Sequence, residues 1–154
     1  MDKIIKIYII VTIISAVFSG ITLAQGLSSE ISLYKILVNE EQQETLIKAD
    51  EVEPADLLEY QILYANNSSS DITALQPVLP IPTGLQLITE DSLDALVSVD
   101  GVHFFAYPIM KTISKEDQLI SIPIDKSMYR FLKWKVDRLE VGKEVTLKAR
   151  MSVL

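Results

Sequence analysis

The chain has 154 residues, no cysteine and a formal net charge of -7, with 21 acidic and 14 basic residues. This length is enough for one domain with its own core, and the lack of cysteine excludes disulfides, thiolate metal sites, a cysteine nucleophile and the lipidated leader of bacterial lipoproteins. Because lysine and arginine must neutralise phosphates in nucleic-acid binding, the acidic balance disfavours a nucleic-acid partner.

The start of the chain has the layout of a secretory leader. A short basic head precedes the apolar run Ile7–Phe18, and the small residues Thr22 and Ala24 stand before a cut. Residues 1–24 are therefore predicted to be a signal peptide, and residues 25–154 one exported domain. The alternative is an uncleaved anchor, since the apolar stretch is close to the roughly 18 residues of a spanning helix. Any membrane contact is expected through this segment alone.

The first strand is predicted over Ile31–Val38, where two apolar faces alternate. The charged run Glu40–Glu44 interrupts it, and Thr45–Ala49 resumes a short extended segment. A calcium-binding edge is an alternative for the acidic run. Calcium sites, however, need oxygens that converge from spaced positions, and adjacent acids usually form a solvated turn.

The stretch Leu57–Asn67 is predicted to be a central strand. Tyr60, Ile62 and Tyr64 alternate on one face, which is typical of a strand with one strongly apolar side. Pro54-Ala55-Asp56 precedes the strand and an Asn/Ser/Asp cluster that begins at Asn66 follows it, so turn-forming residues mark both ends. Tyr60, Ile62 and Tyr64 are expected in the core.

A further strand is predicted over Ile72–Val78, ending at Pro80 and Pro82. Gly84 supplies an unrestricted φ before Leu85–Ile88 becomes extended again. This pattern indicates a kinked edge or a crossover between sheets. A proline-rich docking ligand is the alternative, but two prolines interleaved with apolar residues make a poor polyproline helix.

The segment Leu96–Tyr107 is predicted to be a hairpin, with Asp100-Gly101 as its turn. His103 is the one histidine of the chain. It could act as a general base, but no second histidine or hydroxyl motif accompanies it, so we expect a structural or surface role. Zinc normally takes several histidine or cysteine ligands, so no metal site is predicted here.

The last third of the chain is predicted to hold three strands. Lys111–Asp117 is expected to be a polar loop before the apolar strand Leu119–Ile124. Tyr129–Val136 is expected to be a strand with Trp134 in its middle, where the large ring is a core anchor in preference to a sugar platform.

A turn with Gly142 precedes the cleanest alternation of the chain, Val145–Val153, whose Val145 and Leu147 are expected in the core. This last strand is also the candidate edge for recruiting a partner strand, although its outward lysine and arginine would discourage unwanted pairing. No stretch beyond the leader has an apolar repeat at helical spacing. Several short strands at turn-punctuated intervals predict an all-β fold, an immunoglobulin-like antiparallel β-sandwich.

The order of these features resembles a bacterial conserved-repeat family with an immunoglobulin-like fold, known as domain of unknown function eleven. The likeness covers roughly residues 31–153 in a single copy. The features that carry it are the lead Pro54-Ala55-Asp56, the strand with Tyr60, Ile62, Tyr64 and Asn66, the bend Pro80-Ile81-Pro82-Thr83-Gly84, the Ser98-Val99-Asp100-Gly101 turn, and Trp134 followed by Leu139 and Gly142. Ala55 stands where the family usually has glycine. The resemblance implies a structural or interaction module of the cell envelope and supplies no catalytic residue.

The sequence therefore predicts a periplasmic or secreted module without enzymatic activity, cofactor or metal, whose partners are other envelope proteins. The alternative is a glycan- or ligand-binding module in which Tyr107 and Tyr129 stack on sugar rings. A hydrolase is a third possibility, because paired carboxylates are abundant. Glycosidase carboxylates, however, must lie about 5–10 Å apart in a cleft, which a sequence does not reveal.

Overall fold

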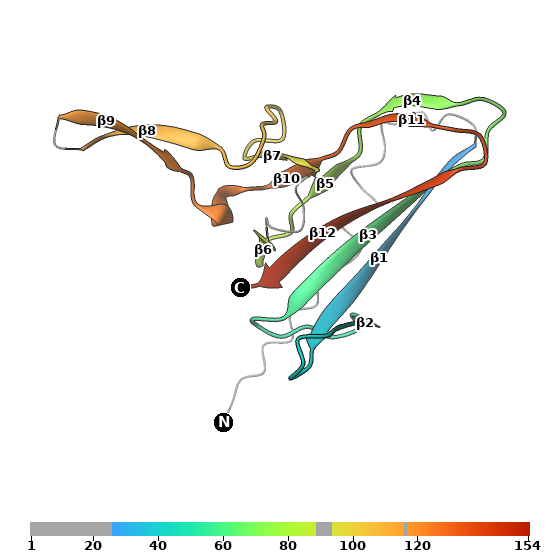
Figure 1. Ribbon diagram of the computed structural model, residues 1–154, viewed down its shortest axis with the longest axis horizontal. Coiled ribbons are helices and arrows are strands. Elements are labelled where there is room, and N and C mark those ends of the chain that lie inside the picture. The colour runs from blue at the N-terminus through green and yellow to red at the C-terminus, as the bar shows by residue number, and fades with distance from the viewer. Residues whose placement is uncertain (1–25, 89–93, 116) are drawn as a thin grey trace.

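The computed structural model describes residues 26–88, 94–115 and 117–154, and the predicted leader lies outside these ranges. The described residues form antiparallel sheets without an α-helix, which confirms the all-β prediction (Figure 1). The strands are β1 (Leu27–Val38), β2 (Glu44–Lys48), β3 (Leu57–Asn66), β4 (Ile72–Leu75), β5 (Val78–Pro80), β6 (Leu85–Ile88), β7 (Leu96–Ser98), β8 (Met110–Lys115), β9 (Gln118–Pro123), β10 (Phe131–Lys133), β11 (Val136–Leu139) and β12 (Glu144–Val153), with a short 3-10 turn η3 (Lys126–Met128).

The largest sheet has the strand order β2-β1-β3-β12-β6, so β3 is its central strand, as predicted. Ile62 of β3 lies opposite Ile31 of β1 and Leu147 of β12, and the next row places Tyr60 between Leu33 and Ala149. Because side chains alternate across a strand, these rows share one face of the sheet. That face supplies half of the core.

A smaller sheet, with the order β5-β10-β7, supplies the other half. Leu79, Leu132 and Val97 occupy one row across its three strands and are buried. They belong to the same apolar cluster as Tyr60 and Ile62 of the large sheet. Both sheets therefore contribute to one core, and a third pair, β4 with β11, extends from it.

Two of the predicted strands are each divided in the structure. The stretch Ile72–Val78 contains β4 and the start of β5, which pair with different strands, β11 and β10. The stretch Tyr129–Val136 contains β10 and the first residue of β11, and Trp134 follows β10 instead of lying mid-strand. Each division allows one segment to serve two sheets.

The predicted Leu96–Tyr107 hairpin is also wrong in its pairing. β7 pairs with β10, and the residues after the Asp100-Gly101 turn return to it through a single bridge between Val97 and Phe105. The turn itself is present, with Gly101 at φ 76°.

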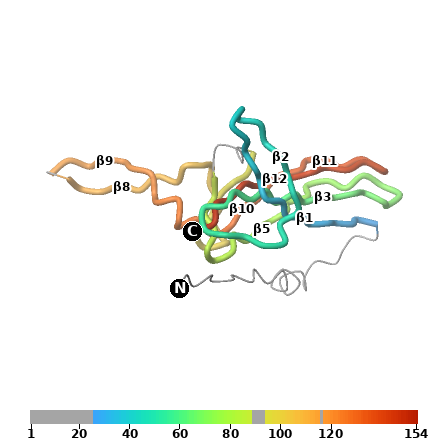
Figure 2. The backbone as a smooth tube through the Cα atoms, turned by 90° about the horizontal axis from the view of Figure 1, so that it is seen from below, coloured from blue at the N-terminus to red at the C-terminus, as the bar shows by residue number. Residues whose placement is uncertain are grey.

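The predicted loop Lys111–Asp117 is instead mostly strand. β8 pairs with β9 over six residue pairs, from Met110 opposite Pro123 to Lys115 opposite Gln118. A backbone hydrogen bond from Ile124 N to Ile109 O closes the base of this hairpin. Figures 1 and 2 show the hairpin extending away from the rest of the molecule. We call residues 110–123 the arm.

The prediction that the last strand is an edge is wrong in part. β12 pairs with β3 over Glu144–Ser152 and with β6 over Arg150–Val153, so its C-terminal end lies inside the sheet. The outermost strands of this sheet are β2 and β6.

Candidate functional site

The six residues expected in the core lie on strands or strand ends that face it. Tyr60, Ile62, Tyr64, Trp134 and Leu147 are buried, and Val145 is partly buried against the same cluster. A backbone hydrogen bond holds Trp134 in place, since its N donates to Pro77 O at 3.0 Å.

Asn66 joins two loops at one end of the large sheet and is fully buried. Its Nδ2 donates to Ser70 O and Leu139 O, both at 2.9 Å, and its Oδ1 accepts from Ser68 N at 3.0 Å and from Ser68 Oγ at 2.6 Å. An amide side chain has two donor hydrogens and an acceptor oxygen with two lone pairs. All four are occupied, so Asn66 has a structural role.

The Pro54 turn closes the entrance to β3. Asp56 N donates to Glu53 O, and Glu53 N donates to Asp56 Oδ2 at 2.7 Å. Ala55 has φ 70°, the left-handed conformation that favours glycine. The turn forms with alanine at this position, and Lys35 Nζ, 2.7 Å from Asp56 Oδ2, ties it to β1.

The Pro82 and Gly142 turns each place a glycine at positive φ. Leu85 N donates to Pro82 O across a turn in which Gly84 has φ 89°. Gly142 has φ 67°, and its N donates to Asn66 O at 2.8 Å. These predicted motif residues therefore shape the backbone.

The Asp100 turn contains the residue types of a catalytic triad but not their order. His103 Nδ1 lies 2.8 Å from Asp100 Oδ2, while the buried Ser98 Oγ donates to Asp100 Oδ1 at 3.0 Å. In a triad the histidine lies between the two other groups. Asp100 Oδ1 also accepts from Val102 N and His103 N, and these hydrogen bonds, first of all those from His103, hold the pKa of Asp100 well below its usual range.

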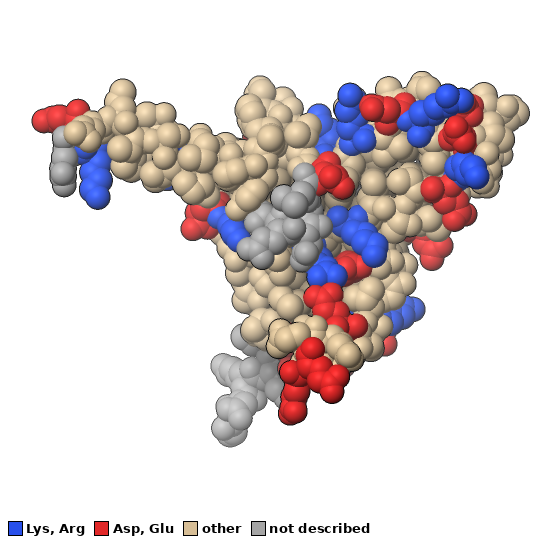
Figure 3. Space-filling model, viewed as in Figure 1, with Lys and Arg blue, Asp and Glu red and all other residues tan. Residues whose placement is uncertain are grey.

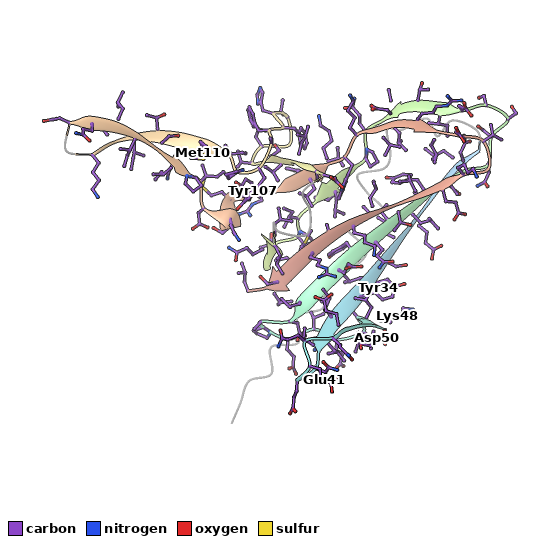
Figure 4. The ribbon with its side chains drawn as sticks, viewed as in Figure 1. Tyr34, Glu41, Lys48, Asp50, Tyr107 and Met110 are labelled. Carbon is purple, nitrogen blue, oxygen red and sulfur yellow. The ribbon has the colours of Figure 1, made fainter. Side chains whose placement is uncertain are left out.

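Tyr129 does not offer a surface for a sugar ring, because it is 1% exposed. Its hydroxyl accepts from Ile109 N at 3.1 Å, and its ring meets Tyr107 edge-to-face with centroids 5.8 Å apart. Tyr107 is partly buried at the base of the arm (Figure 4). The two tyrosines fasten the arm to the body.

A buried carboxylate lies on the face of the large sheet opposite to the core. Glu59 is 1% exposed, and Gln61 Nε2 donates to its Oε1 at 2.6 Å, while Arg150 Nε donates to its Oε2 at 2.9 Å. Lys148 Nζ lies 3.5 Å from Oε1. Burial by itself raises the pKa of Glu59, but the hydrogen bonds and the two positive charges together lower it.

The same arginine reaches the outermost strand. Arg150 Nη1 and Nη2 donate to Glu44 Oε1 and Oε2 at 3.0 and 2.8 Å. Since β2 and β12 are separated by two strands in the sheet order, the β1–β2 end must fold over this face, as Figure 2 shows. The carboxylates hold the arginine in place, and we call these five residues (Glu44, Glu59, Gln61, Lys148 and Arg150) the Glu59 cluster.

The arm is exposed on both faces. Ile113, Ile120 and Ile122 share one face with Lys111 and Lys115, and the other face includes Met110 and Leu119, which is 79% exposed. No arm residue among those described belongs to the core cluster or packs against it. Folding of the body therefore leaves the apolar side chains of the arm outside the core: Met110 and Leu119 are exposed, and the three isoleucines are half-buried.

Within the described ranges, no three His, Asp or Glu side chains converge as metal ligands, and no helix has the length and hydropathy of a membrane span. Comparison of the chain with protein-family models, curated proteins and solved structures gives no match. The resemblance drawn from the motifs thus stays a prediction.

The sequence reasoning missed the Glu59 cluster and the arm. Glu59 interrupts an apolar run in LLEYQILY, which is a usable signal, although its distant partners are not apparent from spacing. The arm has a signal in the β-branched residues Thr112 and Ile113, which favour a strand.

Proposed function

We propose that this chain is an exported, non-enzymatic protein-interaction module of the bacterial cell envelope, and that the arm is its binding element. The predicted leader and the ordered motifs of the envelope family support export. The shared core of the two sheets is consistent with the immunoglobulin-like sandwich that this family implies, and we propose that arrangement for the body.

The arm carries the proposal. An isolated two-stranded hairpin is marginally stable in water, and the exposed Leu119 and Met110 on one face and the half-buried isoleucines on the other stabilise nothing in the body. A protein partner that covers them would gain about 1.5–3 kcal/mol for each large side chain fully buried. Leu119 and the isoleucine face are thus suited to a protein surface.

The polar clusters support a role without catalysis. In the Asp100 turn the aspartate is engaged by backbone amides, and in the Glu59 cluster the carboxylate oxygens are occupied by Gln61, Lys148 and Arg150. These groups shape and hold the fold.

Photo-crosslinking in the producing cell tests the proposal. A photoreactive residue at Leu119 should give discrete adducts with protein, whereas the same residue at Lys135, whose side chain is 71% exposed on the body, should give none. Fractionation and N-terminal sequencing of the same sample should place the protein in the envelope with residues 1–24 removed. Equal labelling from both positions, or none from Leu119, would refute the role of the arm.

A further inference from the structure

The large sheet has an unpaired edge at β2. Among the described residues β2 pairs with β1 alone, and all five of its residues are exposed. Two of them are large apolar side chains, Leu46 at 38% exposed and Ile47 at 43%. An exposed edge strand with apolar side chains is a template for another strand. We call β2 the open edge.

The hydrogen bonds between β1 and β2 determine which backbone groups of the open edge point outward. Ala49, directly after β2, donates from its N to Leu33 O at 3.1 Å, so Ala49 is in a hydrogen-bonded pair with β1. Such pairs alternate along an antiparallel ladder, so Ile47 also bonds to β1, while the N–H and C=O of Leu46 point away from it. A docking strand would therefore pair with Leu46.

Carboxylates lie at both ends of the open edge, and they are exposed and form no ion pair with a described residue. They are Glu40 and Glu41 before β2 and Asp50, Glu51 and Glu53 after it. Lys48 is the one basic residue between positions 40 and 53, and Glu44 of β2 itself is held by Arg150. Figure 3 shows acidic side chains gathered at this end, and Figure 4 places Glu41 and Asp50 there. A docking strand thus meets negative charge at each end.

These charges decide which strand fits. A second copy of β2 would bring the same carboxylates to the site, and like charges opposed across two strands destabilise their pairing. Charges beside an edge protect it from unwanted partners, and the same charges attract a segment of opposite sign. The open edge is therefore closed to acidic strands and suited to basic ones.

We propose that the open edge binds an extended, basic peptide segment of another protein, which adds antiparallel to β2. Since five paired residues span about 17 Å at about 3.4 Å each, the segment needs two apolar residues opposite Leu46 and Ile47 and a lysine or arginine toward each end. Leu46 and Ile47 lie on opposite faces of β2, so apolar contacts form on both faces. The site is separate from the arm and does not rest on the arm being a binding element.

The first test measures binding of a labelled octapeptide to the full chain by fluorescence anisotropy. The peptide has two lysines at each end and Thr-Val-Ile-Thr between them, so that a threonine lies opposite Lys48 in the proposed register. It should bind at least about tenfold more tightly than two controls, one with glutamates for the lysines and one with Gly-Pro-Gly-Pro as its centre. Equal binding of the proline peptide would reduce the attraction to charge alone and overturn strand addition, and no binding of the first peptide would overturn the site.

A proline at the open edge tests the role of the backbone. Leu46→Pro removes the outward N–H but no hydrogen bond to β1, so its urea midpoint should stay close to that of the wild type. It should weaken binding of the octapeptide about tenfold, which is about 1.4 kcal/mol. The matched control, Leu46→Val, keeps the N–H and should bind within about twofold of the wild type. Equal affinities of the two variants would overturn the proposal.

The carboxylates are tested by a pair of double variants with the same change in net charge. Glu41→Gln with Asp50→Asn should weaken binding about threefold at low salt, because exposed ion pairs are individually weak. Asp137→Asn with Glu140→Gln removes two exposed charges at β11, which lies apart from β2 in Figure 1, and should leave the affinity unchanged. Equal losses in both variants would show an effect of overall charge and contradict the site.

Amide hydrogen exchange reads the register directly. Saturation with the octapeptide should slow exchange of the Leu46 N–H and leave that of the Ile47 N–H, already bonded to β1, unchanged. An unchanged Leu46 rate in the complex would overturn the strand addition.

Discussion

Replacing Asn66 with alanine should strongly destabilise the body. The substitution removes four hydrogen bonds and leaves Leu139 O without its side-chain donor in a buried site. A hydrogen bond contributes about 1 kcal/mol net, and an unsatisfied buried group costs more. Since part of the loop rehydrates, we expect a loss of about 3 kcal/mol, which is roughly 2 M in urea midpoint at a slope of about 1.5 kcal/mol/M.

The assay is equilibrium urea unfolding followed by tryptophan fluorescence, because the one tryptophan, Trp134, is buried in the core. The matched control is Asn67→Ala. Asn67 is the exposed neighbour, whose Nδ2 makes one hydrogen bond, to Ser28 Oγ, so its loss should be within about 0.5 kcal/mol. Equal midpoints for the two variants would refute the reasoning.

Asn66→Asp tests the donor role of Nδ2 apart from the acceptor role of Oδ1. Its carboxylate can still accept from Ser68 N, but it faces Leu139 O and Ser70 O where the amide donated to them. The ionised form should therefore be disfavoured in the folded protein, and the aspartate pKa should rise. Relative to the wild type, the free energy of unfolding of this variant should be highest below the ordinary aspartate pKa and fall as the pH rises from about 4 to 7. A flat profile would contradict the assigned amide orientation.

Three further changes probe the turn, the charge cluster and the arm. Ala55→Gly should raise the free energy of unfolding by about 0.5–1 kcal/mol, measured in urea, because alanine is disfavoured at φ 70° by more than the extra chain entropy of glycine. Glu59→Gln should cost about 2 kcal/mol at pH 7, since Arg150 keeps Glu44 as a partner. The stability that Glu59 contributes is present above its ordinary pKa of 4.5 and is lost as the pH falls through its lowered pKa in the folded protein. The free energies of unfolding of the wild type and of Glu59→Gln should therefore become more similar in acid. Replacing Met110–Pro123 with Asn-Gly should leave the free energy of unfolding unchanged to within about 0.5 kcal/mol, because no described arm residue packs on the core. A larger drop in the urea midpoint of the tryptophan signal would contradict this.

The sequence predicted best where one face of a strand is buried and its ends carry turn residues. β3 has both signals, in the alternation of Tyr60, Ile62 and Tyr64 and in the turns around Pro54 and Asn66, and its bounds differ from the prediction by one residue. β12 was predicted equally well for the same reason. In such strands the core enforces the period of two.

The prediction failed where burial does not enforce the pattern. The polar character of Lys111–Asp117 indicates a loop, but an arm that lies outside the core needs no strict apolar period, and the β-branched Thr112 and Ile113 are the better indicator. Trp134 was placed mid-strand because alternation continues through it, although the chain leaves β10 there for another sheet. The fold of the β1–β2 end over Glu59 depends on contacts between residues far apart in sequence, which local patterns do not contain.

The separation of stability from binding follows from this distribution. The loops that Asn66 holds and the core rows of Tyr60 and Leu132 fix the body, while the arm adds an exposed surface without contributing to the core. Substitution of Leu119 should therefore change association without moving the unfolding midpoint, and substitution of Asn66 should move the midpoint without changing association of the protein that stays folded. If substitutions of Leu119 and of Asn66 each changed both association and the unfolding midpoint, the arm would be part of the folding unit. The case for a dedicated binding element would then fail.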